Sequence, residues 1–293
     1  MGADGNWVPP QSEYLVPFDG TFRVSGARTS PLVEPDKTEL DAARRKQTRA
    51  IRKLQRKLYA EDTYAVLFVF QAMDAGGKDS TIRSVFTGVN PAGFQVSSFQ
   101  APSSKERDHD FLWRISRQLP ERGRIGIFNR SHYEEVLVVR VHPELLDTQK
   151  LPHYDLSTIW SERFEAIRGF ERHLADSGTV IVKFFLNVSL EEQKRRLLRR
   201  IEKPSKNWKF NPDDIRERER WPDYMNAFEE ALNATSRPWA PWYAIPADSK
   251  PFMRLQVAQI VRETLRGLGV EYPELDDEAR SALDACRERL ERS

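Results

Sequence analysis

The chain alternates short, continuously apolar segments with longer amphipathic ones, and this alternation narrows its possible folds more than any other feature. Strands are expected at 65–70, 95–99, 124–128, 180–186 and 242–245. Helices are expected between them, at 79–87, 105–118, 131–139, 158–175, 190–201, 212–233 and 250–265. Strands that are apolar on both faces belong to parallel sheets covered by helices on both sides. The pattern therefore predicts an α/β fold, a three-layer sandwich around a central parallel sheet.

The rest of the chain fits one domain spanning 1–293. Residues 1–35 are rich in Pro and Gly and read as an extended arm, and 37–60 reads as a long charged helix, so 1–60 forms an N-terminal arm and helix. No internal repeat or long linker divides the chain, and 293 residues bury a substantial core. The prolines at 204 and 212 interrupt the helical pattern, which predicts a connector near 202–211.

Composition and charge exclude several classes of protein. The apolar runs have strand length, so no membrane span is expected, and no secretory leader is recognised. Cys286 is the only cysteine, so an intrachain disulfide is impossible and a cytoplasmic location is expected. The net charge is +2, yet 191–210 is strongly basic and the tail is acidic. A local basic patch in a nearly neutral chain indicates an anion site rather than a nucleic-acid surface.

The segment "LFVFQAMDAGGKDSTI", residues 67–82, reads as a strand, a Gly-rich turn and a helix start, which is the layout of a phosphate-binding loop. It departs from G-x-x-x-x-G-K-[ST] twice, with Ala72 for the first glycine and Asp79 for the hydroxyl residue after Lys78. Backbone N–H groups and the helix dipole favour phosphate in such a turn. The expected phosphate ligands are Ala75, Gly76, Gly77, Lys78, Asp79 and Ser80. The alternative is a strand–helix turn that binds nothing.

Magnesium is expected beside this loop. Asp74 and Asp79 supply carboxylates where the usual hydroxyl ligand is missing. In the second segment, "GRIGIFNRSHYEEVLVVRVHP", a strand ends at Asn129, and Arg130 is placed to grip a phosphate. Because Asn129 is uncharged, Glu134 or Glu135 in the following helix is the candidate for the missing carboxylate. Ser131 with Glu134 also fits an S-x-x-E capping box, and that local role does not exclude a metal role for Glu134.

Several linked motifs carry a resemblance to a known family. The segments "AMDAGGKDSTI", "GVNPAGFQV", "FQAPSSKERDHDFLWR", "GIFNRSHYEEVLVVRVHP", "PSKNWKF" and "ATSRPWAPWYAIPADSK" together resemble polyphosphate kinase family 2, over residues 7–268. Asn129, where other branches have Asp, resembles the branch called class III. The resemblance implies a P-loop kinase-like fold with a helical lid, and transfer of phosphoryl groups from inorganic polyphosphate to AMP as well as ADP, giving ADP and ATP.

The basic segment fits such a donor. Arg195, Arg199 and Lys203 recur at i, i+4 spacing on one helical face, with Arg196 and Arg200 alongside. Like charges so placed repel, so they suggest an anion that offsets the cost, although a solvated helix neutralised by glutamates is the alternative. The resemblance implies that about 190–215 forms the lid. Lys206 and Lys209 lie at its tip.

The expected mechanism is in-line phosphoryl transfer. Asp74, Lys78 and Arg130 are the expected catalytic residues, with Mg²⁺ (alternatively Mn²⁺) held by Asp74 and Glu134. The expected nucleotide-binding residues are Arg83, Gly88, Asn90, Arg114, Asn129 and Arg130. The acceptor is an ionised phosphate, so a strong general base is unnecessary.

The expected partners are inorganic polyphosphate, the adenine nucleotides AMP, ADP and ATP, and a second copy in a homodimer or homotetramer. No nucleic acid or membrane partner is expected. Two rival functions remain, an ATP-dependent small-molecule or nucleotide kinase and a non-catalytic polyphosphate- or RNA-binding protein. The choice between AMP and ADP, the base preference and the dominant direction stay open.

Overall fold

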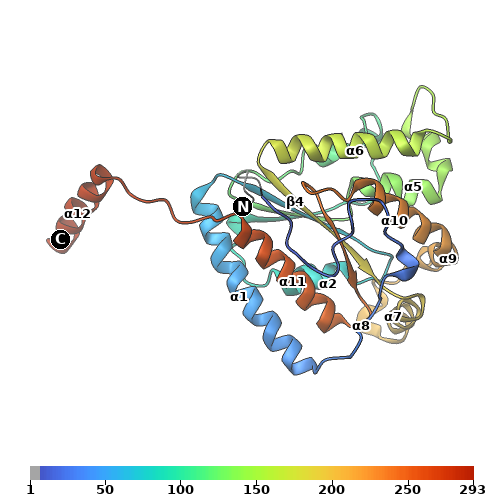
Figure 1. Ribbon diagram of the computed structural model, residues 1–293, viewed down its shortest axis with the longest axis horizontal. Helices are drawn as coiled ribbons and strands as arrows, with labels where there is room; N and C mark the ends of the chain where they lie inside the picture. Colours follow the sequence, from blue (N-terminus) through green and yellow to red (C-terminus); the bar gives the residue numbers. More distant parts are fainter. Residues whose placement is uncertain (1–6) are drawn as a thin grey trace.

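The computed structural model describes residues 7–293, and this part of the chain contains a five-stranded sheet. Neighbouring strands are parallel, in the order β2-β3-β1-β4-β5 (Figure 1). The strands are β1 (Ala65–Gln71), β2 (Phe94–Ser98), β3 (Ile125–Asn129), β4 (Thr179–Asn187) and β5 (Trp242–Pro246). The predicted α/β fold with a central parallel sheet is confirmed.

The central strands lie entirely inside the molecule. Every residue of β1 is buried, as is β4 from Val180 onward, because β1 lies between β3 and β4 and both of its faces are covered. The rings of Phe70 and Phe184 stack with centroids 4.9 Å apart. Edge strand β2 is only partly buried. The carboxyl end of β1, where the phosphate loop begins, is therefore held in the best-packed part of the sheet.

Helices cover the sheet in two groups, which Figure 1 shows on its two sides. One group comprises α1 (Lys37–Glu61), α2 (Lys78–Val85) and α11 (Lys250–Gly267). The other comprises α5 (Val138–Val141), α6 (Ile159–Asp176) and α10 (Trp221–Thr235). The remaining helices are η1 (Val24–Gly26), η2 (Pro91–Gly93), α3 (Ser104–Arg107), α4 (Trp113–Ser116), η3 (His132–Val136), η4 (Pro143–Gln149), α7 (Leu190–Glu202), α8 (Pro204–Asn207), α9 (Asp213–Glu219) and α12 (Asp277–Glu291).

The helix predicted at 105–118 is wrong, because the structure has two short helices there. Ser103 opens α3 with a capping box, its hydroxyl accepting from the N–H of Glu106 while the Glu106 carboxylate accepts from the N–H of Ser103. The carboxylate of Asp110 then accepts the backbone N–H of Leu112 at 2.9 Å. Such local side-chain bonds compete with the helical ladder, so α3 stops and α4 starts afresh.

The helix predicted at 131–139 is also divided, into the 3₁₀-helix η3 and the short α5. The Ser131 hydroxyl caps η3 by accepting from the N–H of Tyr133 at 3.2 Å. Glu134 lies toward the Arg130 guanidinium, 3.9 Å away, instead of reaching back to the cap. The reciprocal S-x-x-E capping box is therefore not formed.

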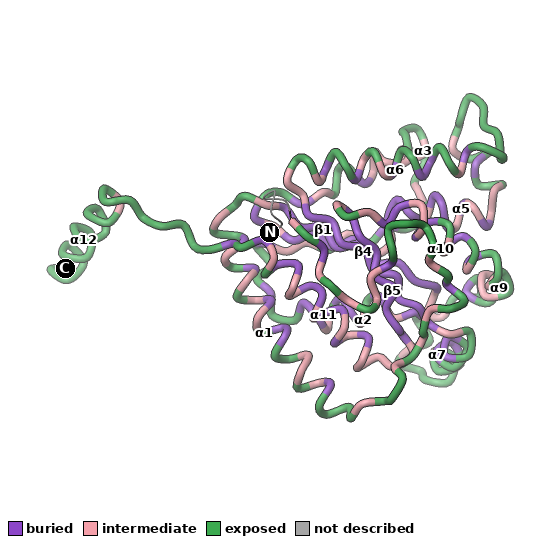
Figure 2. Tube along the Cα trace, in the orientation of Figure 1, coloured by how far each residue is buried: buried purple, intermediate pink, exposed green. Residues whose placement is uncertain are grey.

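Two segments lie outside the sandwich. The described part of the arm runs beside β5, where Val16 donates to the carbonyl of Trp242 and Ala244 donates to that of Tyr14. Helix α12 lies away from the sheet in Figure 1, and Figure 2 shows it almost entirely exposed. One domain over 1–293 stays a prediction, and residues 1–6 of the arm lie outside the described part. No helix within 7–293 is long and apolar enough to cross a membrane.

Candidate active site

The phosphate loop joins β1 to α2 in a turn that only small residues fit. Ala75 and Gly77 have positive φ values, 59° and 108°. A Cβ on Gly76 would lie 2.6 Å from the Cβ of Ala72 and 2.8 Å from the carbonyl oxygen of Met73. Glycine at position 76 is thus required by close packing, and Ala72 forms part of the wall of the turn. The expected strand–loop–helix layout is present.

Lys78, the first residue of α2, is buried beneath the loop. Its ammonium donates to the carbonyl oxygen of Ala72 at 2.7 Å. Burial lowers the pKa of Lys78, and the nearby Arg130 guanidinium lowers it further, against the carboxylates of Asp74, Glu134 and Asp79. A buried ammonium next to a second cation is stabilised by any anion that enters the site.

Arg130 follows β3 and lies on the other side of the loop. Its φ of 62° is uncommon for a residue with a side chain, so the surrounding structure holds it in place. Its guanidinium is 2.8 Å from a carboxylate oxygen of Asp74 and 3.9 Å from one of Glu134. The charge of Glu134, more than that of Asp74, raises the pKa of Arg130 against the effect of burial. Arg130 is therefore a fixed cation between two acids.

Three acidic side chains adjoin Lys78 in different environments. Burial raises the pKa of Glu134, although the charges of Arg130 and Lys78 oppose it. Burial alone would raise the pKa of Asp79, but a hydrogen bond from the Asn129 amide at 2.9 Å and the charges of Lys209 and Lys78 lower it. Asp79 is thus kept ionised at the entrance of α2, in contact with the predicted strand-end residue Asn129.

No three acidic, His or Cys side chains of the described chain lie together as a complete metal site. Mg²⁺ seldom needs one, because it keeps several waters and takes one or two carboxylates together with substrate phosphates. Asp74 and Glu134 both lie within ion-pair distance of the Arg130 guanidinium, and the charges of both raise the pKa of Lys78. The carboxylate pair expected to hold the metal is thus brought together.

The predicted lid helices close a cavity of about 610 Å³ over the loop. This donor cavity is lined by the loop from Asp74 to Ser80, and by the cationic residues Arg83, Arg130, Arg196, Arg199, Arg200, Lys206, Lys209, Lys250 and Arg254. Only one carboxylate besides Asp74 lines it, that of Asp79. The cavity therefore carries a large excess of positive charge.

The lid residues expected on this surface divide into two pairs. Arg199 and Lys209 line the cavity, whereas Arg195 and Lys203 do not. The Arg195 side chain is 76% exposed and pairs with Glu192. Lys203 is exposed at the end of α7. Arg195 and Arg199 are one turn apart on the same face of α7, so their position along the helix, not its phase, separates them.

Arg196 is a site residue that the sequence pattern did not single out. It is buried, and its guanidinium donates to the carbonyl oxygens of Ala75, Gly76, Ala247 and Asp248. These bonds join the phosphate loop to the segment before α11, and together with the bond from Nε to the Glu192 carboxylate at 2.6 Å they engage all the donors of Arg196. The residue is thus a clamp on the loop backbone. A basic run alone does not reveal which member turns inward.

A second cavity, of about 250 Å³, opens on the other side of Arg130. Its walls include the rings of Phe99 and Phe111 and the side chains of Arg107, Arg114 and Glu134. Arg114 is already engaged, donating to the carbonyl oxygen of Gln100 at 2.7 Å and lying over the Phe99 ring. The side chain of Arg107 has no hydrogen bond or ion pair with any described residue, and its Nε is buried. This acceptor cavity pairs apolar walls with one free guanidinium.

The other expected nucleotide ligands are spread more widely. Arg83 and Asn129 line the donor cavity, and Arg130 lines both cavities. Gly88 lies against the Arg52 side chain, and Asn90 caps η2 by accepting the N–H of Ala92. Neither Gly88 nor Asn90 lines the donor or acceptor cavity. Phe111 and Arg107 were missed, although the motif "SSKERDHDFLWR" that contains them was noticed.

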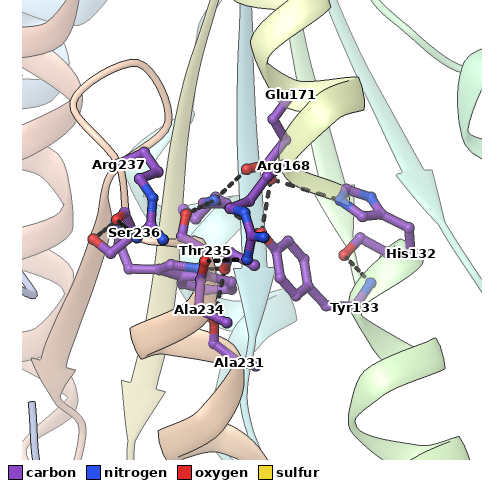
Figure 3. Close-up of polar contacts among 12 residues, drawn as sticks. His132, Tyr133, Arg168, Glu171, Ala231, Ala234, Thr235, Ser236 and Arg237 are labelled. Atoms are coloured by element: carbon purple, nitrogen blue, oxygen red, sulfur yellow. Dashed lines mark hydrogen bonds and ion pairs between the residues drawn. The ribbon is translucent and has the colours of Figure 1, made fainter. Parts of the chain in front are cut away.

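Behind the acceptor cavity lies a buried ionic cluster, made of His132, Tyr133, Glu171 and Lys183 (Figure 3). The Lys183 ammonium donates to Glu171 at 2.5 Å, to the Tyr133 hydroxyl at 2.8 Å and to the Thr235 carbonyl at 2.9 Å. Burial lowers the pKa of Lys183 to about 8 despite the Glu171 carboxylate. The cluster ties η3, and so the segment after Arg130, to α6 and β4.

Comparisons with known proteins show which family the chain resembles. Residues 34–272 match the family model described as "Polyphosphate kinase 2 (PPK2)". An "ADP-polyphosphate phosphotransferase" of Rhodopseudomonas palustris is 51% identical over 248 residues, covering 84% of this chain and 86% of the relative. An "AMP/ADP-polyphosphate phosphotransferase" of Meiothermus ruber is 49% identical over 226 residues, covering 77% and 81%.

A solved structure shares the same architecture. The "Polyphosphate Kinase 2 from Arthrobacter aurescens TC1" superposes with a TM-score of 0.82 at 37% identity, and the match covers 90% of this chain and 93% of that chain. The family match spans more than half of the sequence, including the phosphate loop, the lid and both cavities. The chain belongs to the polyphosphate kinase 2 family.

Proposed function

We propose that this protein transfers the terminal phosphoryl group of inorganic polyphosphate to ADP and AMP, giving ATP and ADP. One observation carries the proposal beyond family membership. Two cavities of opposite character meet at Arg130, a cationic one over the phosphate loop and an apolar-walled one beside it. The first suits a donor made only of phosphates, and the second suits an acceptor with a base and a sugar.

The donor side supports polyphosphate rather than ATP. The donor cavity is lined by many Arg and Lys side chains, and Phe99 is its one aromatic residue. Polyphosphate has no base to recognise, so it needs only cations and backbone N–H groups along its length. An ATP donor would also bring an adenine ring, for which the wall of the donor cavity offers no aromatic side chain except Phe99. Lys78 and the lid residues Arg199 and Lys209 are proposed to hold the donor's terminal phosphates.

The acceptor side supports a nucleotide. Phe99 and Phe111 give the acceptor cavity aromatic walls for a base. Arg107, which has no partner in the described chain, is proposed to bind the α-phosphate. Arg130 lines both cavities and would contact the phosphates on either side of the transferred group. The names of the two relatives above differ in whether they include AMP, so acceptor range is the finer part of this proposal.

Transfer would proceed in line. An oxygen of the acceptor's terminal phosphate forms a bond to the donor's terminal phosphorus, and the bond from that phosphorus to its bridging oxygen breaks. The shortened polyphosphate leaves with the electron pair. Lys78 and Arg130 stabilise the charge on the equatorial oxygens. The attacking oxygen is already ionised near neutral pH, so no side chain must remove a proton, and positioning contributes most of the rate.

Magnesium, or alternatively manganese, is proposed as the cofactor. Asp74 and Glu134 would hold it, and when bound it neutralises charge that builds up between the two phosphates. The proximity of both carboxylates to Lys78 and Arg130 supports this assignment, because otherwise two acids would share a site meant for anions. Substituting Asp74→Asn is expected to weaken metal binding. The Mg²⁺ concentration that gives the half-maximal rate should therefore rise.

Nucleotide product analysis tests the proposal. Purified protein, Mg²⁺ and long-chain polyphosphate are incubated with AMP or ADP, and the products are separated by chromatography. ATP from ADP is expected, with ADP and then ATP from AMP, and an Arg107→Gln variant should raise the KM for the nucleotide without changing that for polyphosphate. Transfer only when ATP is the donor would favour a small-molecule kinase, and no transfer with tight polyphosphate binding would favour a binding protein.

A homodimer or homotetramer in the cytoplasm completes the proposal. Light scattering of the purified protein measures its mass, and a mass of one chain at micromolar concentration would contradict the assembly. The absence of nucleic-acid and membrane partners stays a prediction.

A further inference from the structure

A groove lined by six arginines runs along the molecule next to the donor cavity. Its volume is about 560 Å³, and it lies between α1, α2 and α11, which are neighbours in Figure 1. The arginine groove, as we call it, is lined by Arg44, Arg45, Arg49, Arg52, Arg83 and Arg254. The other lining residues are Ser and Thr. No acidic and no aromatic side chain contributes to its wall.

Most of these arginines have no partner in the described chain. Arg44 lies 3.5 Å from the Asp41 carboxylate and donates to the Ser84 carbonyl oxygen at 3.0 Å. The side chains of the other five form no hydrogen bond or ion pair with any residue in 7–293. The Nε atoms of Arg52 and Arg254 are shielded from solvent without an acceptor. Burial, and after it the charge of Arg44, lowers the pKa of Arg254.

Unpaired like charges in one groove repel one another, and the cost is greater where burial reduces the screening by water. A bound polyanion removes this cost, because each of its phosphates accepts several charge-assisted hydrogen bonds. The composition of the wall defines the ligand further. Single-stranded nucleic acid is held by aromatic side chains that stack on its bases, and the groove has none. A chain of phosphates without bases fits.

The arginine groove is continuous with the donor cavity. Ser80, Arg83 and Arg254 line both. A polyphosphate whose terminal phosphate lies at Lys78 must extend away from the loop, and these three residues mark an exit at the start of α2 and α11. Cations continue along that path onto α1.

We propose that the arginine groove binds the part of the polyphosphate chain distal to the transferred phosphate, and thereby gives the enzyme its preference for long chains. This inference rests on the proposed function, because it assumes that the donor's reactive end lies over the phosphate loop. A chain long enough to reach α1 gains contacts that tripolyphosphate, confined to the donor cavity, does not make. The groove adds affinity for the donor without touching the reacting atoms.

Arg45 and Arg49 provide the test, because both are exposed and their substitution leaves the core unchanged. The Arg45→Gln/Arg49→Gln variant is compared with Lys46→Gln/Lys53→Gln, which removes two equally exposed charges of the same helix outside the groove. KM is measured for long-chain polyphosphate and for tripolyphosphate, with ADP as acceptor. The groove variant should raise the KM for long chains about tenfold, or about 1.4 kcal/mol, with far less change for tripolyphosphate. The lysine variant should change neither.

Binding without turnover gives a second readout. Long-chain polyphosphate is titrated calorimetrically into each protein without nucleotide or metal, at two salt concentrations. The groove variant should bind more weakly and lose part of the salt dependence, because fewer phosphates are neutralised. Inorganic phosphate at equal phosphate content is the comparison ligand. Weaker binding of inorganic phosphate with an unchanged KM for long chains would overturn the proposal in favour of a separate anion site.

Other outcomes separate the two proposals. Equal changes in KM for long and short donors, or none, would overturn the groove's role while leaving the proposed function intact. A change in mass by light scattering before any polyphosphate is added would assign the arginines to subunit contact instead. Failure of the unsubstituted protein to use either donor would refute the proposed function itself.

Discussion

Two charged regions lie on opposite sides of the segment that follows β3, and they are built differently. In the donor cavity, the Lys78 ammonium has one hydrogen bond, to a backbone carbonyl. The lid contributes several cationic side chains to the cavity wall and no acidic one. In the cluster behind it, Lys183 donates to three oxygens and Glu171 accepts from Lys183 and Tyr133. One region has a surplus of charge that faces a cavity, whereas the other is closed and nearly neutral.

The contrast distinguishes charges that bind from charges that support. A buried ion pair whose hydrogen bonds are complete has no free group for a ligand. Removing one of its partners lowers the free energy of unfolding. A buried cation without a matching anion lowers the stability of the folded protein, and a bound anionic ligand offsets that loss. Substitutions in the two regions should therefore separate stability from turnover.

The largest effect is expected from breaking the closed cluster. Glu171→Ala leaves the Lys183 ammonium buried without its carboxylate, so the free energy of unfolding should fall by about 3–5 kcal/mol. Urea denaturation followed by circular dichroism measures it. The matched control is the double variant Glu171→Leu/Lys183→Met, which should recover most of the loss and keep the wild-type KM for polyphosphate. If the double variant were as unstable as the single one, an apolar pair could not replace the ion pair, and the loss of an unpaired Lys183 charge would not explain the result.

Lys78 should give the opposite result. Lys78→Met removes a cation that is proposed to contact the transferred phosphate, so kcat should fall about 10²–10³-fold. Because burial disfavours its charge, the free energy of unfolding should stay unchanged or rise. Single-turnover rates and urea denaturation are measured on the same preparation. If kcat were retained and stability lost, Lys78 would act like the ion pair of the closed cluster, and the distinction between binding and stabilising charges would fail.

Arg195 and Arg196 sharpen the comparison within one helix turn. Arg196→Met leaves four backbone carbonyls of the loop and of the segment before α11 without a donor, and should cost about 2–3 kcal/mol of stability together with affinity for polyphosphate. Arg195→Met removes an exposed cation from Glu192, which keeps its ion pair with Arg196, and should change stability by less than about 0.5 kcal/mol. Thermal unfolding and the KM for polyphosphate separate the two. Equal changes in thermal stability and KM for the two variants would mean that the number of positive charges, and not the hydrogen bonds of Arg196 to the loop, determines both quantities.

Much of this arrangement follows from the sequence because its causes are local. Continuous apolar runs predicted the parallel sheet, and the small residues at 75–77 predicted a loop that admits no larger side chain at Gly76. The chemistry of Lys78 and Arg130 follows from their positions at the ends of β1 and β3. Parallel strands end at the same edge of a sheet, so the two side chains had to lie close.

The parts that escaped prediction depend on tertiary contacts. The inward turn of Arg196 rather than Arg195 is set by where α7 packs, not by its spacing of charges. Lys183 stands in an otherwise apolar strand, and its partners come from η3, α6 and the end of α10, far apart in sequence. Arg107 is the last residue of the short helix α3, in a segment where the sequence pattern predicted one helix running on to 118.

The last effect, which depends on pH, concerns Asp214, a residue between the two kinds of region. Its carboxylate pairs with Arg200 of the lid at 2.6 Å. Burial, and after it the negative charge of Asp74, nevertheless raises the pKa of Asp214 to about 6. An acid whose pKa is higher in the folded protein than in the unfolded chain binds its proton more tightly when folded. Its contribution to stability is therefore complete below pH 3.8, the ordinary value, and declines as pH rises to about 6.

Asp214→Asn should abolish this decline, so the difference in unfolding free energy between wild type and variant should shift in the variant's favour between pH 4 and pH 6. Urea denaturation at several pH values measures that difference, which cancels the titration of all other groups. A shift in this direction would group Asp214 with the open cavity, because its ionised carboxylate would then destabilise the fold unless a cation offsets it. A difference that stays constant across the window would mean that Arg200 fully compensates Asp214, which would then belong with the closed, supporting pairs.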